Sequence, residues 1–206
     1  MHPKGKQSEA NYKETKGDRT KKELYEMALR LFREKGYENV SIREIVEKAG
    51  TAKGTFYIYF ATKADVIVEM LRYYDDRYEK VIEQLPEGTS PLAAIQTLVW
   101  ESCVFTEQII GVDLIRVLYT HQLMKNGEKQ EEMDSNRSLY RLLRHFFARG
   151  QEQGIFCQTL SPEGMTAWLI RAMRGTFYEW SLENGDFNLS RETRNFTDVL
   201  LQGFQK

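Results

Sequence analysis

Apolar side chains recur at every third or fourth position along nearly the whole chain, and this spacing is the strongest constraint on its fold. One early stretch places Leu24, Met27, Ala28, Leu31 and Phe32 on a single stripe. An α-helix repeats every 3.6 residues, so such a stripe lies on one helical face. No stretch alternates with the two-residue period of a half-buried strand. The 206 residues also include only 4 prolines, which favours helices over a loop-rich all-β fold. The sequence therefore predicts an all-α fold.

Capping signals divide this pattern into about nine helices. Ser41 and Glu44 have the spacing of a capping box. A Ser-Pro pair precedes two later helices, at Ser90 and Ser161. Gly36 and Gly50 would end the first two helices, and Thr51, Thr62 and Ser190 are further candidate N-caps. The predicted helices lie near 20–35, 42–49, 52–59, 63–85, 91–107, 110–124, 131–153, 162–183 and 191–204.

The charge is unevenly divided along the chain. Residues 1–65 hold 14 Lys and Arg against 10 Asp and Glu, whereas the rest holds 15 against 20. A basic segment of this kind favours an anionic partner such as nucleic acid, although a solvated surface would look the same. We predict a flexible basic arm at 1–19, a helix-turn-helix domain at 20–63 and a larger helical domain at 64–206.

Several classes of protein do not fit the sequence. No apolar run approaches the roughly 20 residues of a membrane-spanning helix, and the first residues lack the apolar core of a signal peptide. The two cysteines, Cys103 and Cys157, lie far apart, and His121 and His145 lack metal-ligand spacing. No catalytic motif such as HExxH or GxSxG occurs. We therefore expect a cytoplasmic protein that is not an enzyme, with no cofactor, no metal and no membrane partner.

Residues 41–60 form the pattern of a helix-turn-helix, in which the second helix enters the major groove of DNA. Gly50 supplies the tight turn between two short helices. Phe56 and Phe60, four residues apart, would hold the second helix from behind. Its outer face would offer Lys53, Thr55, Tyr57, Ile58 and Tyr59 to DNA, with Gly54 allowing close backbone approach and Lys63 binding a phosphate. The alternative is a plain helical hairpin within a bundle.

The run LRLFREKGYENVSIREIVEKAGTAKGTFYIYFATKADVI at 29–67 resembles the DNA-binding domain of the tetracycline-repressor (TetR) family. The chain departs from that pattern at Val46, where the family usually has Ala, and at Thr51-Ala52, where it has Val-Ser. The positions that match the family's motif are Phe32, Gly36-Tyr37, Ser41 to Ile45, Ala49-Gly50, Gly54 to Tyr57, Tyr59-Phe60 and Lys63.

The resemblance implies particular DNA contacts. It implies base contacts from Arg43, Lys53, Thr55, Ile58 and Tyr59, and phosphate contacts from Tyr57 and Lys63. Ile58 stands at a position that varies in the family, and a thymine methyl group is the natural partner of an apolar side chain there.

The resemblance also implies that the larger domain binds an effector and forms the dimer. Plain core packing would also explain each residue of the expected effector pocket. These residues are Tyr74, Tyr78, Trp100, Cys103, Val104, Leu118, His121, Phe146, Met173 and Phe177. The expected dimer interface comprises Met165, Trp168, Leu169, Ala172, Gly175, Thr176, Trp180, Phe196 and Leu200. The alternative is that these residues belong to the core of an ordinary monomer.

Together these features predict a homodimeric, ligand-responsive transcriptional regulator. It would be a repressor that a small apolar or aromatic effector releases from a palindromic double-stranded DNA operator. The alternative is a helical protein-binding adaptor whose helix-turn-helix does not read DNA. The two differ in salt dependence, because only real phosphate contacts make DNA affinity fall steeply with salt.

Overall fold

The computed structural model describes residues 15–124 and 136–206. Over these ranges the chain forms nine α-helices, one short π-helix and no strand beyond an isolated bridge between Phe156 and Gln205. The predicted all-α class is therefore confirmed. The chain divides between Lys63 and Ala64 into two compact units, which are described separately below.

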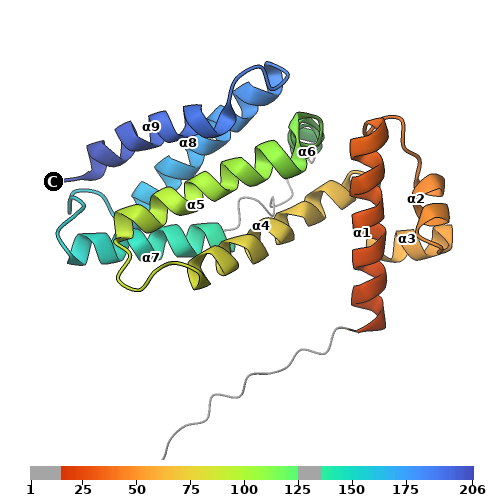
Figure 1. The fold of residues 1–206 in the computed structure, drawn as a ribbon, viewed down its shortest axis with the longest axis horizontal. Coiled ribbons are helices and arrows are strands. Elements are labelled where there is room, and N and C mark those ends of the chain that lie inside the picture. The colour runs from red at the N-terminus through yellow and green to blue at the C-terminus, as the bar shows by residue number, and fades with distance from the viewer. Residues whose placement is uncertain (1–14, 125–135) are drawn as a thin grey trace, which may run out of the picture. The chain divides into compact units, whose positions relative to one another are not determined.

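The N-terminal unit consists of α1 (Lys16–Lys35), α2 (Ile42–Lys48) and α3 (Lys53–Tyr59), labelled in Figure 1. Helices α2 and α3 have seven residues each, which is too short for a stable isolated helix. Tertiary packing must therefore hold them. Leu24 and Ala28 of α1, Ile45 of α2 and Phe56 of α3 are all fully buried, and each large apolar side chain buried in this way contributes about 1.5–3 kcal/mol.

The C-terminal unit is a helical bundle built around α5. Its elements are α4 (Asp65–Glu83), α5 (Pro91–Phe105), the π-helix η1 (Thr106–Ile110), α6 (Val112–Met124), α7 (Ser138–Glu152), α8 (Pro162–Leu182) and α9 (Leu189–Phe204). Helix α5 packs against α4, α7 and α9, and α8 packs against α6, α7 and α9. Figure 1 shows α5, in green, running through the bundle between α4 and α9. Its side chains Ile95 and Leu98 are fully buried there, as is Leu143 of α7.

The first helix begins four residues earlier than the sequence pattern predicts. Thr15 caps α1, because its hydroxyl accepts a hydrogen bond from the Asp18 amide at 3.1 Å and the Asp18 carboxylate accepts one from the Thr15 amide at 3.1 Å. The predicted arm at 1–19 is therefore wrong over residues 16–19. Residues 1–14 lie outside the described ranges.

Other helix starts differ because side chains expected to cap have different partners. Ala52 and Ala64 precede α3 and α4 without a side-chain cap, in place of Thr51 and Thr62. The cap of α9 is Asn188, because the Ser190 hydroxyl donates to Glu107 instead. Helix α5 ends in η1 before α6 begins, and α7 begins at Ser138 rather than near 131. Residues 125–135, where the helix predicted at 131–153 would begin, lie outside the described part.

Candidate DNA interface and ligand cavity

The turn between α2 and α3 has the geometry that the sequence predicts. Gly50 has a φ of +67°, a left-handed conformation that glycine adopts readily. The Thr51 amide donates to the Val46 carbonyl at 2.9 Å and closes the turn. Phe56 and Phe60 then anchor α3, with ring centroids 5.4 Å apart and both side chains buried. One face of α3 is thus fixed, and the opposite face is available to a partner.

Several of the DNA-contact residues predicted on α3 are exposed, and Gly54 and Ile58 lie on that opposite face. Lys53 and Gly54 are exposed, Tyr57 is 49% exposed and Ile58 is 75% exposed. Most of the Ile58 side chain is therefore accessible to a partner. Thr55 and Tyr59 are partly exposed at the edges of the same helix.

Arg43 lies on the exposed side of α2 and pairs with Glu47, its Nε donating at 2.7 Å to the carboxylate. An exposed pair of this spacing stabilises a helix by only about 0.3–0.5 kcal/mol. A good bidentate contact to a base contributes about 1–3 kcal/mol. Arg43 can therefore leave Glu47 for a base at little cost.

Lys63 makes contacts that the sequence analysis did not predict. It precedes α4 rather than opening it, and its ammonium group donates to the carbonyls of Tyr37 at 2.7 Å and Val40 at 3.0 Å. The same nitrogen lies 4.0 Å from the centre of the Tyr37 ring. Partial burial lowers the pKa of Lys63. These contacts hold Lys63 against the turn between α1 and α2. A contact between Lys63 and a DNA phosphate stays a prediction.

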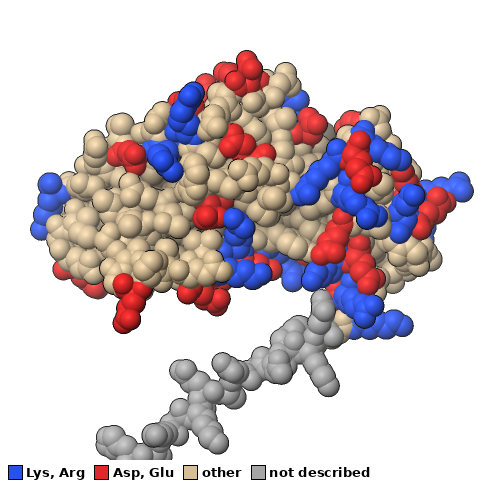
Figure 2. All heavy atoms as spheres, in the orientation of Figure 1, with Lys and Arg blue, Asp and Glu red and all other residues tan. Residues whose placement is uncertain are grey.

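Figure 2 shows Lys and Arg interleaved with Asp and Glu over the N-terminal unit. Several of these charges are paired, as Lys35 with Glu44 and Arg19 with Glu23. The visible surface is therefore not a uniform positive field. Affinity for DNA would have to come from individually placed groups rather than from net charge alone.

The C-terminal unit contains a cavity of about 110 Å³ whose lining is mostly apolar. Two buried hydrogen bonds support its wall: the Tyr74 hydroxyl lies 2.6 Å from that of Thr106, and the Tyr78 hydroxyl lies 2.7 Å from that of Ser102. Burial raises the pKa of both tyrosines, so they stay protonated. The lining comprises Leu71, Tyr74, Tyr78, Ser102, Ile115, Leu118, Tyr119, Gln122, Arg137, Leu139, Tyr140, Ile170, Met173, Arg174 and Phe177.

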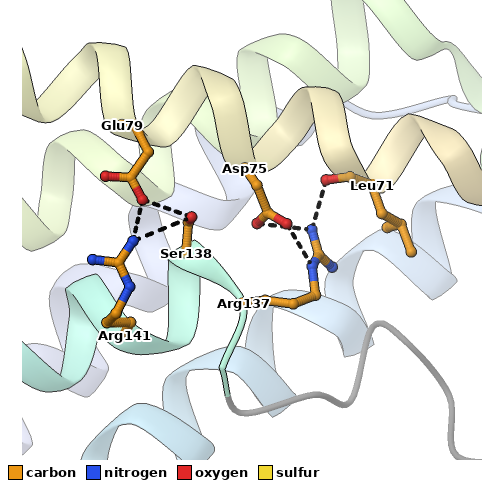
Figure 3. A network of polar contacts seen from close by, with 6 residues as sticks. All are labelled: Leu71, Asp75, Glu79, Arg137, Ser138 and Arg141. Carbon is orange, nitrogen blue, oxygen red and sulfur yellow. Dashed lines mark hydrogen bonds and ion pairs between the residues drawn. The ribbon is translucent and has the colours of Figure 1, made fainter. Parts of the chain in front are cut away.

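Arg137 is fixed at the edge of this cavity by α4. Figure 3 shows its guanidinium group facing Asp75, with both contacts at 3.1 Å, while a further 2.8 Å hydrogen bond reaches the Leu71 carbonyl. The next residue, Ser138, and Arg141, one turn further along α7, both reach Glu79. These pairs join the start of α7 to the middle of α4.

The cavity brings together only part of the predicted effector set. Tyr74, Tyr78, Leu118, Met173 and Phe177 line it. Val104, His121 and Phe146 are outside its lining, and His121 instead lies 3.5 Å from Asp65 at the start of α4.

Trp100 and Cys103 line a different cavity, between α5 and α9. Sequence reasoning missed Arg137, Tyr119 and Arg174 as lining residues. A signal was present in Arg174, which interrupts a mostly apolar stretch, whereas Arg137 stands in a polar run that gave none.

Part of the predicted dimer interface is already used within the subunit. Met165 and Leu169 are fully buried, and Trp180 is 4% exposed with its indole N–H donating to the Phe187 carbonyl at 3.0 Å. These three side chains are not available to a partner. The remaining predicted residues, all at least partly exposed, are Trp168, Ala172, Gly175, Thr176, Phe196 and Leu200.

The described ranges contain neither a membrane span nor a cluster of metal ligands. Outside residues 1–14 and 125–135, no helix is long and apolar enough to cross a membrane. The same residues contain no group of three or more His, Cys, Asp or Glu side chains that could hold a metal ion.

A short helix with one buried face behind a tight glycine turn is the arrangement of a helix-turn-helix. Residues 24–70 match the family model described as bacterial regulatory proteins, tetR family. The match assigns this segment, and not the whole chain, to that model.

Individual relatives are consistent with that assignment. The uncharacterised HTH-type transcriptional regulator YuxN of Bacillus subtilis is 34% identical over 129 residues, which are 57% of this chain but only 44% of YuxN. The HTH-type transcriptional repressor KstR2 of Mycobacterium tuberculosis is 23% identical over 188 residues, 89% of this chain and 92% of that protein.

The fold also resembles solved structures. The repressor FadR of Thermus thermophilus, solved in complex with lauroyl-CoA, superposes with a TM-score of 0.69 at 21% identity and covers 89% of this chain and 94% of FadR. At this level of identity the likeness shows the fold alone.

Proposed function

We propose that the protein is a ligand-responsive transcriptional regulator, a repressor that a small apolar or aromatic effector releases from a palindromic operator. The observation that carries the proposal is α3, where Phe56 and Phe60 fix one face while Tyr57 and Ile58 are exposed away from it. Major-groove reading requires this combination of a rigid helix and free side chains. Acting on chromosomal DNA, the protein would work in the bacterial cytoplasm.

The cavity beside Tyr74 and Tyr78 is the proposed effector site. Its volume of about 110 Å³ is below the roughly 150 Å³ of a cavity that holds benzene. A single-ring compound would nearly fill it, and a longer ligand would have to widen it. Since FadR of Thermus thermophilus was solved with lauroyl-CoA, an effector screen should include acyl-CoA thioesters of different chain lengths beside small aromatic compounds.

A homodimer would place two copies of α3 on two half-sites. Such half-sites lie about 34–36 Å apart, one turn of DNA. The partly exposed side chains of α8 and α9 support a dimer through these helices: Trp168 is 48% exposed and Val199, which the sequence analysis did not include, is 70% exposed. Gly175 lies between them in the chain, on the solvent side of α8, and would permit close approach.

Selection of bound sequences from a random DNA pool tests the proposal. We expect a two-fold symmetric consensus, and the same pool selected with an Ile58→Ala variant should lose preference at one position in each half-site. A lack of enrichment by the folded protein, with and without the compounds of the effector screen, would overturn the DNA-reading role and favour a protein-binding adaptor.

A further inference from the structure

A second cavity, of about 350 Å³, lies between α5 and α9. This volume is at the lower end of the range for small-molecule sites, roughly 300–1,000 Å³. Its lining shares no residue with that of the proposed effector cavity. The residues that line it are Gln96, Thr97, Val99, Trp100, Cys103, Ser190, Arg194, Thr197 and Asp198.

The two cavities lie on different faces of α5. Ser102 belongs to the effector cavity, whereas its neighbour Cys103 and the preceding Val99 and Trp100 belong to the second one. Successive residues of a helix point about 100° apart, which explains why adjacent positions serve different spaces. One turn of α5 therefore forms part of the wall of both cavities.

The second cavity is also separate from the proposed dimer face. On α9 the buried stripe runs through Thr193 and Thr197. Arg194 lies about 100° to one side of Thr193, and Phe196 lies about 60° to the other side. The cavity is on the Arg194 flank, and the apolar side chains proposed for the dimer are on the Phe196 flank.

A buried hydroxyl in the lining has no hydrogen-bond partner. Thr197 is 2% exposed, and its Oγ1 is buried and makes no hydrogen bond within the subunit. Leaving a buried hydroxyl unsatisfied costs about 1–3 kcal/mol, so such groups usually meet a ligand or water. Since Thr197 lines the cavity, a polar molecule bound there can supply the missing partner.

Both signs of charge are present in the same lining. Arg194 stacks on the indole of Trp100, with the guanidinium carbon 4.2 Å from the ring centre. This arrangement covers one face of the guanidinium and leaves its edge N–H groups for a planar carboxylate. Asp198 accepts a hydrogen bond from the Gln96 amide at 2.9 Å through one carboxylate oxygen, which leaves the other as an acceptor.

The charges select the class of ligand. A simple anion would be attracted by Arg194 but repelled by Asp198, and a simple cation would experience the reverse. A molecule that carries both charges pairs with both side chains. We propose that this cavity binds a small zwitterion, a free α-amino acid, with its carboxylate on Arg194, its ammonium group on Asp198 and a polar atom on Thr197.

Isothermal titration calorimetry with the full chain and each of the free L-amino acids tests this proposal. Each amino acid that binds is then compared with its hydroxy-acid analogue, which lacks the ammonium group, and its amine analogue, which lacks the carboxylate. We expect at least one amino acid to bind and both analogues to bind at least tenfold more weakly. No binding by any amino acid, or equal binding by an analogue, would overturn the proposal.

Variants assign the binding to the cavity. Arg194→Gln and Asp198→Asn should each weaken binding at least tenfold, whereas Arg191→Gln, an exposed arginine of α9 outside the lining, should leave it unchanged. Thr197→Val should weaken binding while leaving the melting temperature of the free protein equal or higher, because it removes the unpaired hydroxyl. Binding that survives both charge variants but is lost in Met173→Ala would place the ligand in the effector cavity and overturn the proposal. None of these readouts requires DNA, so their outcome is independent of the proposed regulatory function.

Discussion

At the scale of single residues, a substitution at Gly54 should affect the stability of the fold and the affinity for DNA in opposite directions. A methyl group added at Gly54 would meet no atom within 4 Å, and alanine is favoured over glycine in a helix by about 0.8–1.0 kcal/mol. We expect Gly54→Ala to keep or raise the melting temperature and to weaken operator binding at least tenfold, because the methyl group would hold α3 away from the DNA backbone. Thermal unfolding and fluorescence anisotropy measure the two effects. An unchanged operator affinity would contradict the close approach.

The two cysteines should react with alkylating reagents at very different rates. Cys103 is 1% exposed, and burial raises its pKa to about 12. Cys157 is partly exposed, and a hydrogen bond from the Thr159 hydroxyl lowers its pKa. Because the thiolate is the reactive form, iodoacetamide near pH 7.5 should label Cys157 first and Cys103 only after unfolding. Mass spectrometry of timed samples checks this order, and equal labelling rates in the folded protein would disprove it.

At the scale of the elements, Lys63 is predicted to stabilise the turn between α1 and α2. Lys63→Met removes two hydrogen bonds to partly buried carbonyls, so we expect a loss of about 1–3 kcal/mol in the free energy of unfolding. It should leave the salt slope of DNA binding unchanged, whereas the loss of a phosphate contact reduces that slope by about 0.9.

Lys53→Met is the matched control for this experiment. Lys53 is exposed on α3, so its replacement should lower operator affinity and leave stability nearly unchanged. If the Lys63 variant had normal stability and a reduced salt slope, the result would contradict the structural role and support the phosphate contact predicted from the sequence.

Two ion pairs join α4 to the start of α7, and they differ in how exposed their side chains are. The Arg137 and Asp75 side chains are 17% and 26% exposed, and those of Arg141 and Glu79 are 51% and 42% exposed. A double-mutant cycle with Arg137→Met and Asp75→Leu should give a coupling energy of about 1–3 kcal/mol. The corresponding cycle for Arg141 and Glu79 should give about 0.2–1 kcal/mol, because exposed pairs are screened. Similar values for both cycles, measured by urea unfolding, would contradict this difference.

Sequence patterns predicted elements better than they predicted the partners of individual side chains. The turn at Gly50 and the anchoring pair Phe56 and Phe60 are local features, so spacing alone was enough to find them. The partners of Lys63 are carbonyls 23 and 26 residues away, which only the folded chain brings close. The cap of α1 is local, since Thr15 and Asp18 are three residues apart, but the polar composition around Thr15 favoured an arm.

The faces of α5 were the hardest feature to assign. This helix is apolar on most sides, because α4, α7 and α9 all pack against it. A hydrophobic stripe therefore did not indicate which residues face which space. Trp100 and Cys103 were grouped with Tyr74 and Tyr78 for their aromatic and sulfur character, and only the packing of α9 separated them.

At the scale of the whole molecule, effector and DNA should affect each other's binding equally. Thermodynamic linkage requires that a ligand which weakens operator binding by a given factor is itself bound more weakly by that factor in the presence of the operator. We expect paired titrations with an effector found by screening to give equal factors, about 5–150 for typical coupling. A factor of one, that is, no effect of the ligand on operator affinity, would contradict the proposed coupling between the two sites.

The salt dependence of operator binding tests the central claim, that α3 reads DNA, most directly. The measurement is the affinity for the selected consensus and for a scrambled duplex between about 50 and 200 mM salt, a range over which 6–10 phosphate contacts change affinity by roughly 10³–10⁵. We predict a steep fall for both duplexes and, at each salt concentration, tighter binding to the consensus by about 10³ or more. A flat salt response, or equal affinity for the two duplexes, would contradict the account.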